Sequence, residues 1–227
     1  MLNKSKLLEF FDASKITEPI HIIGCGAIGS HIAEQLARMG CSNIHLWDFD
    51  TVSAHNITNQ MFMDKDIGEL KTGAVQAMMA DINYDLLKTT VLHNEGWKDE
   101  LLSGYVFLCV DKIGVRKDII EKNKYNPNCI AFFDFRMRLT DAQHYMSERT
   151  DYEGMERLIA GMDFTSEEAS AATPKSACGT ELSVVYTVKT ITALGIANFV
   201  KLVLGQPTKH TILIDLNLVE CVAFPMD

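Results

Sequence analysis

The chain has 227 residues, 47% of them hydrophobic, and a formal net charge of -9. This length is sufficient for a buried α/β core, and no proline- or serine-rich linker divides the chain, so we expect a single domain over residues 1–227. The acidic balance disfavours a long nucleic-acid backbone as a partner, because such binding requires clustered cations.

Charge and cysteine patterns also bear on location. Residues 1–15 alternate charged and apolar side chains, unlike a signal peptide. The most apolar stretch, residues 184–204, is interrupted by Lys189, Asn198 and Lys201, which indicates a buried helix rather than a membrane span. The six cysteines include no CxxC pair, which is typical of free thiols in a cytosolic protein. We therefore expect a cytoplasmic protein without a membrane or zinc site.

The first predicted elements are a short helix over residues 4–11 and a strand over residues 20–23 that runs into a glycine-rich loop. Gly24, Gly26 and Gly29 form a GxGxxG pattern in this loop. The first glycine allows a tight turn, the second lets the backbone approach a phosphate, and the third lets the next helix pack on the sheet. The amides at the start of that helix supply partial positive charge to an anion.

The helix that follows the loop is predicted over residues 30–39, and a second strand over residues 44–47 runs into Asp48. An acidic residue about twenty residues beyond the glycine loop is typical of nucleotide-binding βαβ units, where it meets a ribose hydroxyl. This order of elements predicts a nucleotide site. The alternative is a tight turn that binds nothing.

A long polar segment follows, from residue 51 to residue 71. It contains Asn56 and Gln60, ends at Lys71, and shows little periodicity. A loop of this length is uncommon unless it has a function.

The remaining elements alternate between helices and strands along the chain. We predict helices over residues 68–83, 97–102, 115–123 and 153–160 and a long one that ends at residue 204, and strands over residues 89–92, 105–110, 129–135, 138–146 and 211–216. This order predicts a Rossmann-like, doubly wound, mainly parallel sheet with helices on both faces and a late antiparallel extension.

Polar residues follow several of the predicted strands. The apolar run over residues 105–110 has the form of a buried parallel strand and ends in Asp111. Asp48 and Asp50 follow an earlier strand. Because open α/β sheets bind ligands beyond the carboxyl ends of their strands, these carboxylates are expected to face one crevice with the glycine loop and the polar segment.

The chemistry of this set suits ATP with Mg2+. Asp48 can accept a hydrogen bond from the ribose, Lys71 can offset phosphate charge, and Asp111 can hold a magnesium ion that bridges phosphate oxygens. Asn56 and Gln60 can donate hydrogen bonds to phosphates. The alternatives are a solvated lysine at a helix start for Lys71 and a helix N-cap for Asp111.

Three segments, residues 24–60, 66–71 and 109–116, resemble the adenylating domain of ubiquitin-activating-enzyme-like proteins, the ThiF/MoeB/HesA family. Residues 178–205 resemble it more weakly. The resemblance implies that a C-terminal carboxylate attacks the α-phosphate of ATP, giving an acyl-adenylate and pyrophosphate. It also implies a ubiquitin-like or sulfur-carrier protein or peptide as the partner, and a homodimer.

The resemblance assigns roles residue by residue. It implies that Asp48 holds the ribose, that Asn56 and Gln60 hold phosphates, that Lys71 acts on the transferring phosphate, and that Asp111 binds the magnesium ion. These roles agree with those inferred from the residues alone.

The chain departs from the family pattern in its arginines. Asn59 stands where the family usually has an arginine, and no arginine precedes Arg38. Loss of a cation that stabilises a phosphoryl-type transition state reduces the rate by orders of magnitude. Arg116, Lys112 or an arginine from a partner chain are the candidate replacements.

Two other readings follow from this departure and from the fold. The first is a nucleotide-binding regulatory subunit that has lost the arginines and does not catalyse alone. The second is an oxidoreductase with a nicotinamide or flavin cofactor, because the same βαβ unit binds dinucleotides. The oxidoreductase would leave Asn56, Gln60 and Lys71 without a role.

Two features near the end of the chain have open interpretations. Cys178 precedes the long helix, at the position where sulfur-carrier activators of this family place a reactive cysteine; its alternative is a small residue packed at a helix start. Ala193, Gly195 and Ala197 on the long helix permit close approach of another backbone, which suits either a dimer interface or core packing.

Overall fold

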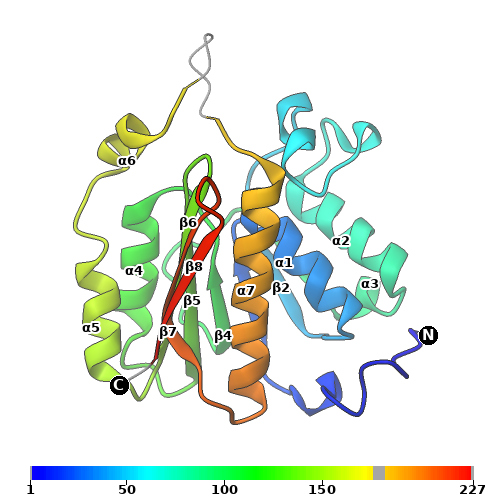
Figure 1. Cartoon of the computed structure of the whole chain (residues 1–227). Coiled ribbons are helices and arrows are strands. Elements are labelled where there is room, and N and C mark those ends of the chain that lie inside the picture. Colours follow the sequence, from blue (N-terminus) through cyan, green and yellow to red (C-terminus); the bar gives the residue numbers. More distant parts are fainter. Residues whose placement is uncertain (1, 176–181, 226–227) are drawn as a thin grey trace.

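A central eight-stranded sheet carries the fold in the computed structural model, which describes residues 2–175 and 182–225 (Figure 1). In chain order the strands are β1 (Ile20–Ile23), β2 (Ile44–Trp47), β3 (Val91–His93), β4 (Gly104–Leu108), β5 (Cys129–Met137), β6 (Asp141–Glu148), β7 (Lys209–Asp215) and β8 (Glu220–Pro225). The order across the sheet is β3-β2-β1-β4-β5-β6-β7-β8. The first five of these are parallel, and β6, β7 and β8 are added antiparallel. The predicted mainly parallel sheet with a late antiparallel extension is therefore confirmed.

Helices cover both faces of the sheet. They are α1 (Ala27–Arg38), α2 (Lys71–Ile82), α3 (Leu86–Thr89), α4 (Ile113–Asn123), α5 (Tyr152–Ala160), α6 (Ser166–Ala172) and α7 (Val185–Val203), with short 3-10 helices at Ala13–Lys15, Ala54–Thr58 and Asp64–Asp66. Buried side chains of α1, α2 and α7 pack on one face, and those of α4 and α5 pack on the other (Figure 1).

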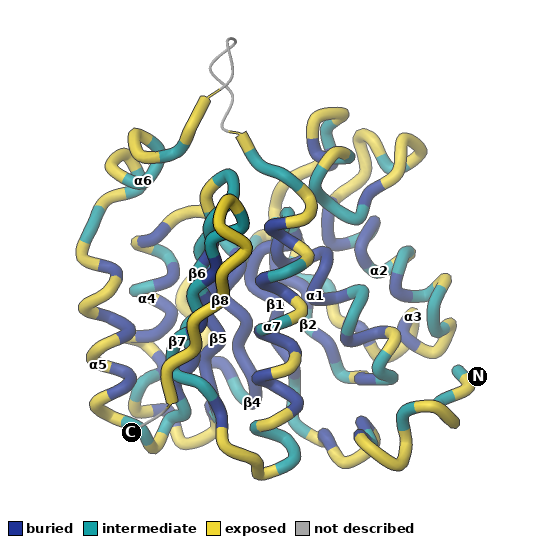
Figure 2. Tube along the Cα trace, in the orientation of Figure 1, coloured by how far each residue is buried: buried dark blue, intermediate teal, exposed yellow. Residues whose placement is uncertain are grey.

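Alternation along the strands divides the core into two layers. Phe107 and Phe133, on neighbouring strands, stack with ring centroids 4.6 Å apart and face α7, where Phe199 meets both rings edge-on. Val106 and Phe132 belong to the other layer, with α4 and α5. The central strands are consequently buried on both faces, whereas β8 is exposed along its whole length (Figure 2).

The structure overturns two predicted helices. Residues 4–11 form isolated turns rather than a helix, with Leu8 and Phe10 exposed. A segment this short gains too little from its own hydrogen bonds to offset helix nucleation. Residues 97–102 are also irregular, because the backbone amide of Lys98 donates to the side chain of Glu100 and thus takes part in a local turn.

The elements that were not predicted include α6 and β8, besides α3 and the short 3-10 helices. The first is capped by Thr165, whose side chain accepts a hydrogen bond from the amide of Glu168 while the Glu168 carboxylate accepts one from the amide of Thr165. The second pairs with β7 as a hairpin.

Within the described residues no helix has the length and apolar character needed to cross a bilayer.

Candidate nucleotide-binding site

The glycine loop between β1 and α1 packs directly on the backbone that follows β4. Gly24 has a φ of +97°, and a Cβ atom there would lie 2.8 Å from backbone atoms of Cys109 and Val110. At Gly29 a Cβ atom would lie 1.8 Å from the carbonyl oxygen of Gly24, so α1 packs tightly over the turn. Around Gly26 there is open space, with no atom within 4 Å of a Cβ built there. The loop therefore presents backbone to a ligand at Gly26.

Asp48 is fixed beside this loop by two backbone hydrogen bonds. Its Oδ2 accepts from the amide of Cys25 at 2.7 Å, and its Oδ1 accepts from the amide of Asp50 at 2.8 Å. Burial raises the pKa of the Asp48 carboxyl, although these hydrogen bonds act in the opposite direction. The end of β2 is thereby joined to the glycine loop, and the carboxylate lies directly beside that loop.

Lys71 is the first residue of α2 and forms an ion pair across the site. Its Nζ atom lies 2.7 Å from Oδ2 of Asp50, and Lys71 as a whole is only 8% exposed. The interpretation of Lys71 as a solvated lysine is therefore wrong. A buried ammonium requires an anion nearby, and phosphate oxygens satisfy that requirement as well as a carboxylate does.

The polar segment after β2 folds over the start of α1. The amide of Met61 donates to Oγ of Ser30 at 3.1 Å, which ties the segment to that helix. The buried Asn56 accepts a hydrogen bond from the amide of Ser53 with its Oδ1, so its oxygen caps the short helix at residues 54–58. The Oε1 atom of Gln60 is buried and has no hydrogen-bond partner. Asn56 thus has a structural role, and Gln60 has a polar atom left to satisfy.

Asp111 stands in the turn between β4 and α4 and is exposed. The N-cap position of α4 belongs to Lys112, so the interpretation of Asp111 as the N-cap is wrong. Within residues 2–175 and 182–225 no hydrogen bond or ion pair engages the Asp111 carboxylate. In the same residues no group of three or more His, Cys, Asp or Glu side chains is placed to hold a metal ion. A Mg2+ ion at Asp111 would therefore take its other ligands from phosphate oxygens and water, as this ion commonly does.

Arg116 does not face the crevice as a free cation. Its Nη1 atom donates to Oδ1 of Asp134 at 2.6 Å and to the carbonyl of Phe135. Its Nε atom donates to the carbonyl of Val110 at 2.7 Å, and Nη2 donates to the same carbonyl. The side chain is 8% exposed. Of the proposed replacements for the missing arginines, Arg116 is therefore already bound to other groups of the protein. Lys112, by contrast, is exposed and adjacent to Asp111 in the chain.

Asp134 is a site-proximal residue that the sequence reasoning missed. It is fully buried, and its second oxygen accepts from Nε of Arg136 at 2.7 Å. The available signal was a charged residue inside an otherwise apolar strand, because such a residue is almost always paired when buried.

Cys178 lies outside the described residues. Of the small residues on α7, Gly195 belongs to the core, because a Cβ atom there would lie 2.2 Å from the ring of Phe135. Ala193 and Ala197 are exposed. Core packing thus accounts for Gly195, and the dimer interface stays a prediction for the exposed Ala193 and Ala197.

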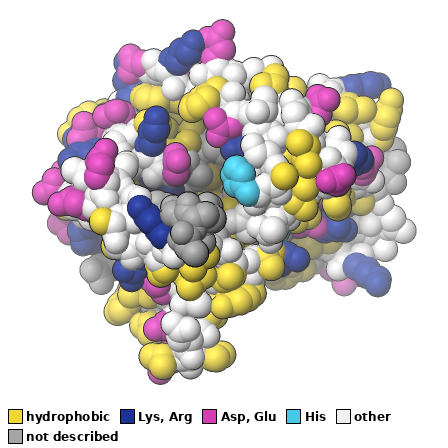
Figure 3. Space-filling view, turned by 90° about the horizontal axis from the view of Figure 1, so that it is seen from above, with side chains coloured by type: hydrophobic (Ala, Val, Ile, Leu, Met, Phe, Trp, Pro, Cys, Tyr) yellow, Lys and Arg dark blue, Asp and Glu magenta, His cyan; other side chains and the backbone are white. Residues whose placement is uncertain are grey.

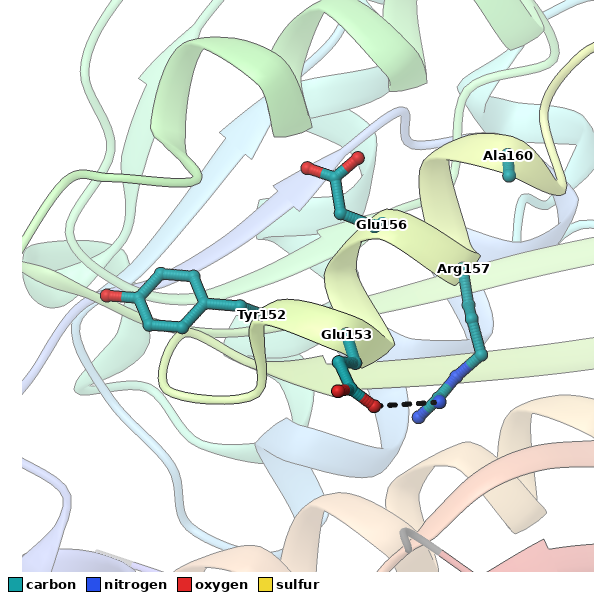
Figure 4. A pocket seen from close by; sticks show the side chains of 5 residues that line it. All are labelled: Tyr152, Glu153, Glu156, Arg157 and Ala160. Atoms are coloured by element: carbon teal, nitrogen blue, oxygen red, sulfur yellow. Dashed lines mark ion pairs between the residues drawn. The ribbon is translucent and has the colours of Figure 1, made fainter.

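Two surface hollows lie outside the candidate site, since neither is lined by the glycine loop, Asp48, Lys71 or Asp111. One of about 280 Å³ lies beyond the carboxyl ends of β2 and β3 and is lined by residues that include Trp47, His93 and Asn94. Another, of about 530 Å³, lies on α5, and its side chains all come from that helix, with Glu153 paired to Arg157 (Figure 4). Seen from above, the molecule is hollowed near its centre, with acidic, basic and apolar side chains around the depression (Figure 3). The α5 hollow is lined by a single helix and by none of the residues of the glycine loop, so it is not the candidate site.

Comparison with known proteins identifies the family. The ThiF family model matches residues 17–218. The chain belongs to the ThiF family. The resemblance inferred from the glycine loop, the Asp48 segment and the Asp111 segment is thereby confirmed.

Curated ThiF-family relatives match part of this chain. Ubiquitin-like modifier-activating enzyme 5 of Rattus norvegicus is 31% identical over an alignment of 125 residues, and the match covers 48% of this chain and 31% of the relative. Molybdopterin-synthase adenylyltransferase of Escherichia coli is 30% identical over an alignment of 115 residues, with coverage of 48% of this chain and 44% of the relative. tRNA threonylcarbamoyladenosine dehydratase of Haemophilus influenzae is 30% identical over an alignment of 116 residues, with coverage of 47% of this chain and 44% of the relative. The chain thus spans less than half the length of these relatives.

Solved structures agree on the fold. E. coli MccB with ATP has a TM-score of 0.71 at 18% identity, and the match covers 94% of this chain and 65% of MccB. E. coli MccB with AMPCPP and selenomethionine MccA has a TM-score of 0.70. At this identity the likeness establishes the ThiF-type fold alone.

Proposed function

We propose that the protein is an adenylyltransferase that uses ATP and Mg2+ to activate a C-terminal carboxylate. The acceptor class is a ubiquitin-like or sulfur-carrier protein, or a peptide. The carboxylate oxygen attacks the α-phosphorus, the bond from that phosphorus to the bridging oxygen of pyrophosphate breaks, and an acyl-adenylate results. When bound, Mg2+ would neutralise charge on the phosphates.

The observation that carries this proposal is the convergence of Asp48, Lys71 and Asp111 around one glycine loop. The amide of Cys25 binds Asp48 on one side of the loop, and Gly24 packs on the backbone that precedes Asp111 on the other. The first amides of α1 lack acceptors within the helix and suit phosphate oxygens. Lys71, which is ion-paired with Asp50 two residues beyond Asp48, supplies a buried cation. The residues present therefore fit a nucleoside triphosphate with one metal ion.

The relatives support the acceptor class. Molybdopterin-synthase adenylyltransferase is named for adenylation, and MccB has been solved both with ATP and with MccA. We carry adenylation to this chain as a proposal because those proteins are longer. A tRNA dehydratase also occurs among the relatives. The net charge of -9 disfavours nucleic acid as the substrate here.

A second candidate is a nucleotide-binding subunit that does not catalyse alone. The arrangement of Arg116 favours it, because this arginine is bound to Asp134 and Val110 and does not replace the missing arginines. Lys112 or an arginine from a partner chain would then have to supply the missing cation. We include a homodimer in the adenylyltransferase proposal for the second of these cases.

Exchange of labelled pyrophosphate into ATP, measured with a panel of candidate C-terminal peptides and carrier proteins, separates these functions. Exchange that depends on a free C-terminal carboxylate supports the enzyme. ATP binding without exchange supports the subunit, and absence of ATP binding contradicts both. An NADH fluorescence titration tests the oxidoreductase in parallel.

A thiol step is a further part of the proposal. The sulfur of Cys178 would attack the acyl carbon of the adenylate, giving a thioester and releasing AMP. Under this scheme Cys178→Ser retains pyrophosphate exchange and loses the thioester adduct, which added thiol or hydroxylamine cleaves. An unchanged adduct would assign the thiol step elsewhere.

A further inference from the structure

The turn that carries Asp111 is held between two parts of the molecule. On one side the backbone of Cys109 and Val110 packs against Gly24. A Cβ atom on Gly24 would lie 2.8 Å from backbone atoms of those two residues. On the other side the carbonyl of Val110 accepts from both Nε and Nη2 of Arg116. The residue directly before Asp111 is therefore fixed from both directions.

Arg116 is itself anchored in β5. Its Nη1 atom bonds Oδ1 of Asp134 and the carbonyl of Phe135. Asp134 is fully buried, and its other oxygen is bonded by Arg136. Only a guanidinium has the planar fork needed to reach a carbonyl and a carboxylate at once. This network links β5 to the turn after β4 without entering the crevice.

We propose that Arg116 and Asp134 form a buried clamp that positions Asp111 for Mg2+ beside the glycine loop. This inference rests on the proposed function. Arg116 and Asp134 are positioning residues, since they touch the Val110 carbonyl rather than the nucleotide or the metal. Substitution of residues that orient a metal ligand without touching the metal commonly lowers metal affinity or activity by about 10- to 100-fold.

The first test replaces Arg116 by lysine. Arg116→Lys keeps a cation for Asp134 but loses the fork on Val110, so we expect the affinity for ATP with Mg2+ to fall about tenfold. The affinity for ATP in EDTA should change less than about twofold, because the glycine-loop amides bind phosphate without the metal. Arg38→Lys is the matched control: Arg38 is also ion-paired, but it is 64% exposed at the far end of α1.

The second test asks whether the clamp acts through Asp111. Asp111→Ala should abolish the gain in ATP affinity that Mg2+ gives. Adding Arg116→Lys to Asp111→Ala should then cause no further loss, because residues that act through one another are not additive. Additive losses, or an Arg116→Lys protein that binds ATP with Mg2+ like the control, would overturn the clamp.

Folding and function are separated by two further measurements. Thermal unfolding without nucleotide checks that Arg116→Lys is folded, and Asp134→Asn, which keeps the shape of the side chain, gives a second variant with the same expected direction. If the unsubstituted protein gains no ATP affinity from Mg2+, the proposed function fails and the clamp fails with it. If Mg2+ does raise the ATP affinity of the unsubstituted protein, and Arg116→Lys and Asp134→Asn keep that gain in full, the clamp alone fails.

Discussion

Lys71 shows how one side chain can support both the fold and the proposed chemistry. It is buried at the start of α2, and its ammonium lies 2.7 Å from Asp50, whose side chain is half exposed. The pair holds the cation beside the glycine loop before any ligand arrives. A phosphate group entering the crevice would then share the ammonium with Asp50.

Lys71→Met tests this role, because methionine keeps much of the side-chain volume and removes the charge. We expect pyrophosphate exchange to fall by about 10²- to 10³-fold, the usual effect of removing one group that stabilises transition-state charge. Lys65→Met, at an exposed lysine of the same polar segment, is the control. Exchange by Lys71→Met at the control rate would remove Lys71 from the proposed mechanism.

We expect two buried histidines to make the stability of the protein depend on pH. His21 accepts a hydrogen bond from Nε1 of Trp47 at 3.0 Å, and burial lowers its pKa to about 3. His144 is also buried, and burial lowers its pKa to about 4. In the unfolded chain both titrate near about 6.5, so below that pH the unfolded state binds more protons than the folded state. Stability is therefore retained above about pH 6.5 and lost as the pH falls below it.

Urea unfolding at about pH 7 and about pH 5 measures this loss, to which each such histidine contributes at most about 1.4 kcal/mol per pH unit. His21→Gln should reduce the pH dependence, because glutamine does not titrate and can still accept from Trp47. His55→Gln, at an exposed position, should leave it unchanged. Equal pH dependence in His21→Gln and the unsubstituted protein would contradict this account.

The junction of α1 with the glycine loop is the tightest contact at the level of elements. Gly29→Ala would place a methyl group 1.8 Å from the carbonyl of Gly24, where the backbone has no room to move without disturbing β1. We expect a loss of about 1–3 kcal/mol in the free energy of unfolding, the usual cost of overpacking. Gly73→Ala is the matched control on α2: no atom lies within 4 Å of its Cβ, and alanine is favoured in helices by about 1 kcal/mol. Chemical denaturation that ranks the two variants in the reverse order would contradict the packing argument.

Elements with strong periodicity were predictable, and elements defined by local or distant pairing were not. The second strand was predicted over residues 44–47, as observed, because a short apolar run ends at polar residues there. The predicted helices over residues 4–11 and 97–102 failed because few of their side chains are buried. The last strand was missed because all six of its residues are exposed and only pairing with β7 defines it.

The candidate site divides in the same way. Gly24, Asp48 and Lys71 belong to a motif whose spacing is fixed along the chain, so the sequence indicates them. The bond between Arg116 and Asp134 depends on how α4 packs on β5, and no local pattern reveals such a pair. The charge of Asp134 in an apolar run signals that a partner exists but does not name it.

At the scale of the whole molecule, self-association is the open prediction. Ala193 and Ala197 are exposed one turn apart on α7, while Gly195 is used by the core. We expect a two-fold dimer on this face. In such an interface a substitution appears on both copies.

Ala197→Arg would therefore place a bulky charge on both sides of the dimer contact, and sedimentation equilibrium should show the dissociation constant rising at least about tenfold, equivalent to about 1.4 kcal/mol. Ala160→Arg, at an exposed alanine of α5, is the control. A monomeric protein would exclude an arginine supplied by a second copy of this chain. A dimer insensitive to Ala197→Arg would place the interface on another surface.

The position of β8 at one edge of the sheet has a consequence for where the protein unfolds locally. This strand is bonded on one side only and buries none of its six residues, whereas β4 lies between two parallel neighbours and is buried throughout. Local opening costs least where few apolar contacts are broken. We therefore expect the hairpin of β7 and β8 to fray and exchange its amide protons while the strands that flank the glycine loop stay closed, so that those inner amides reach solvent only when the whole chain unfolds.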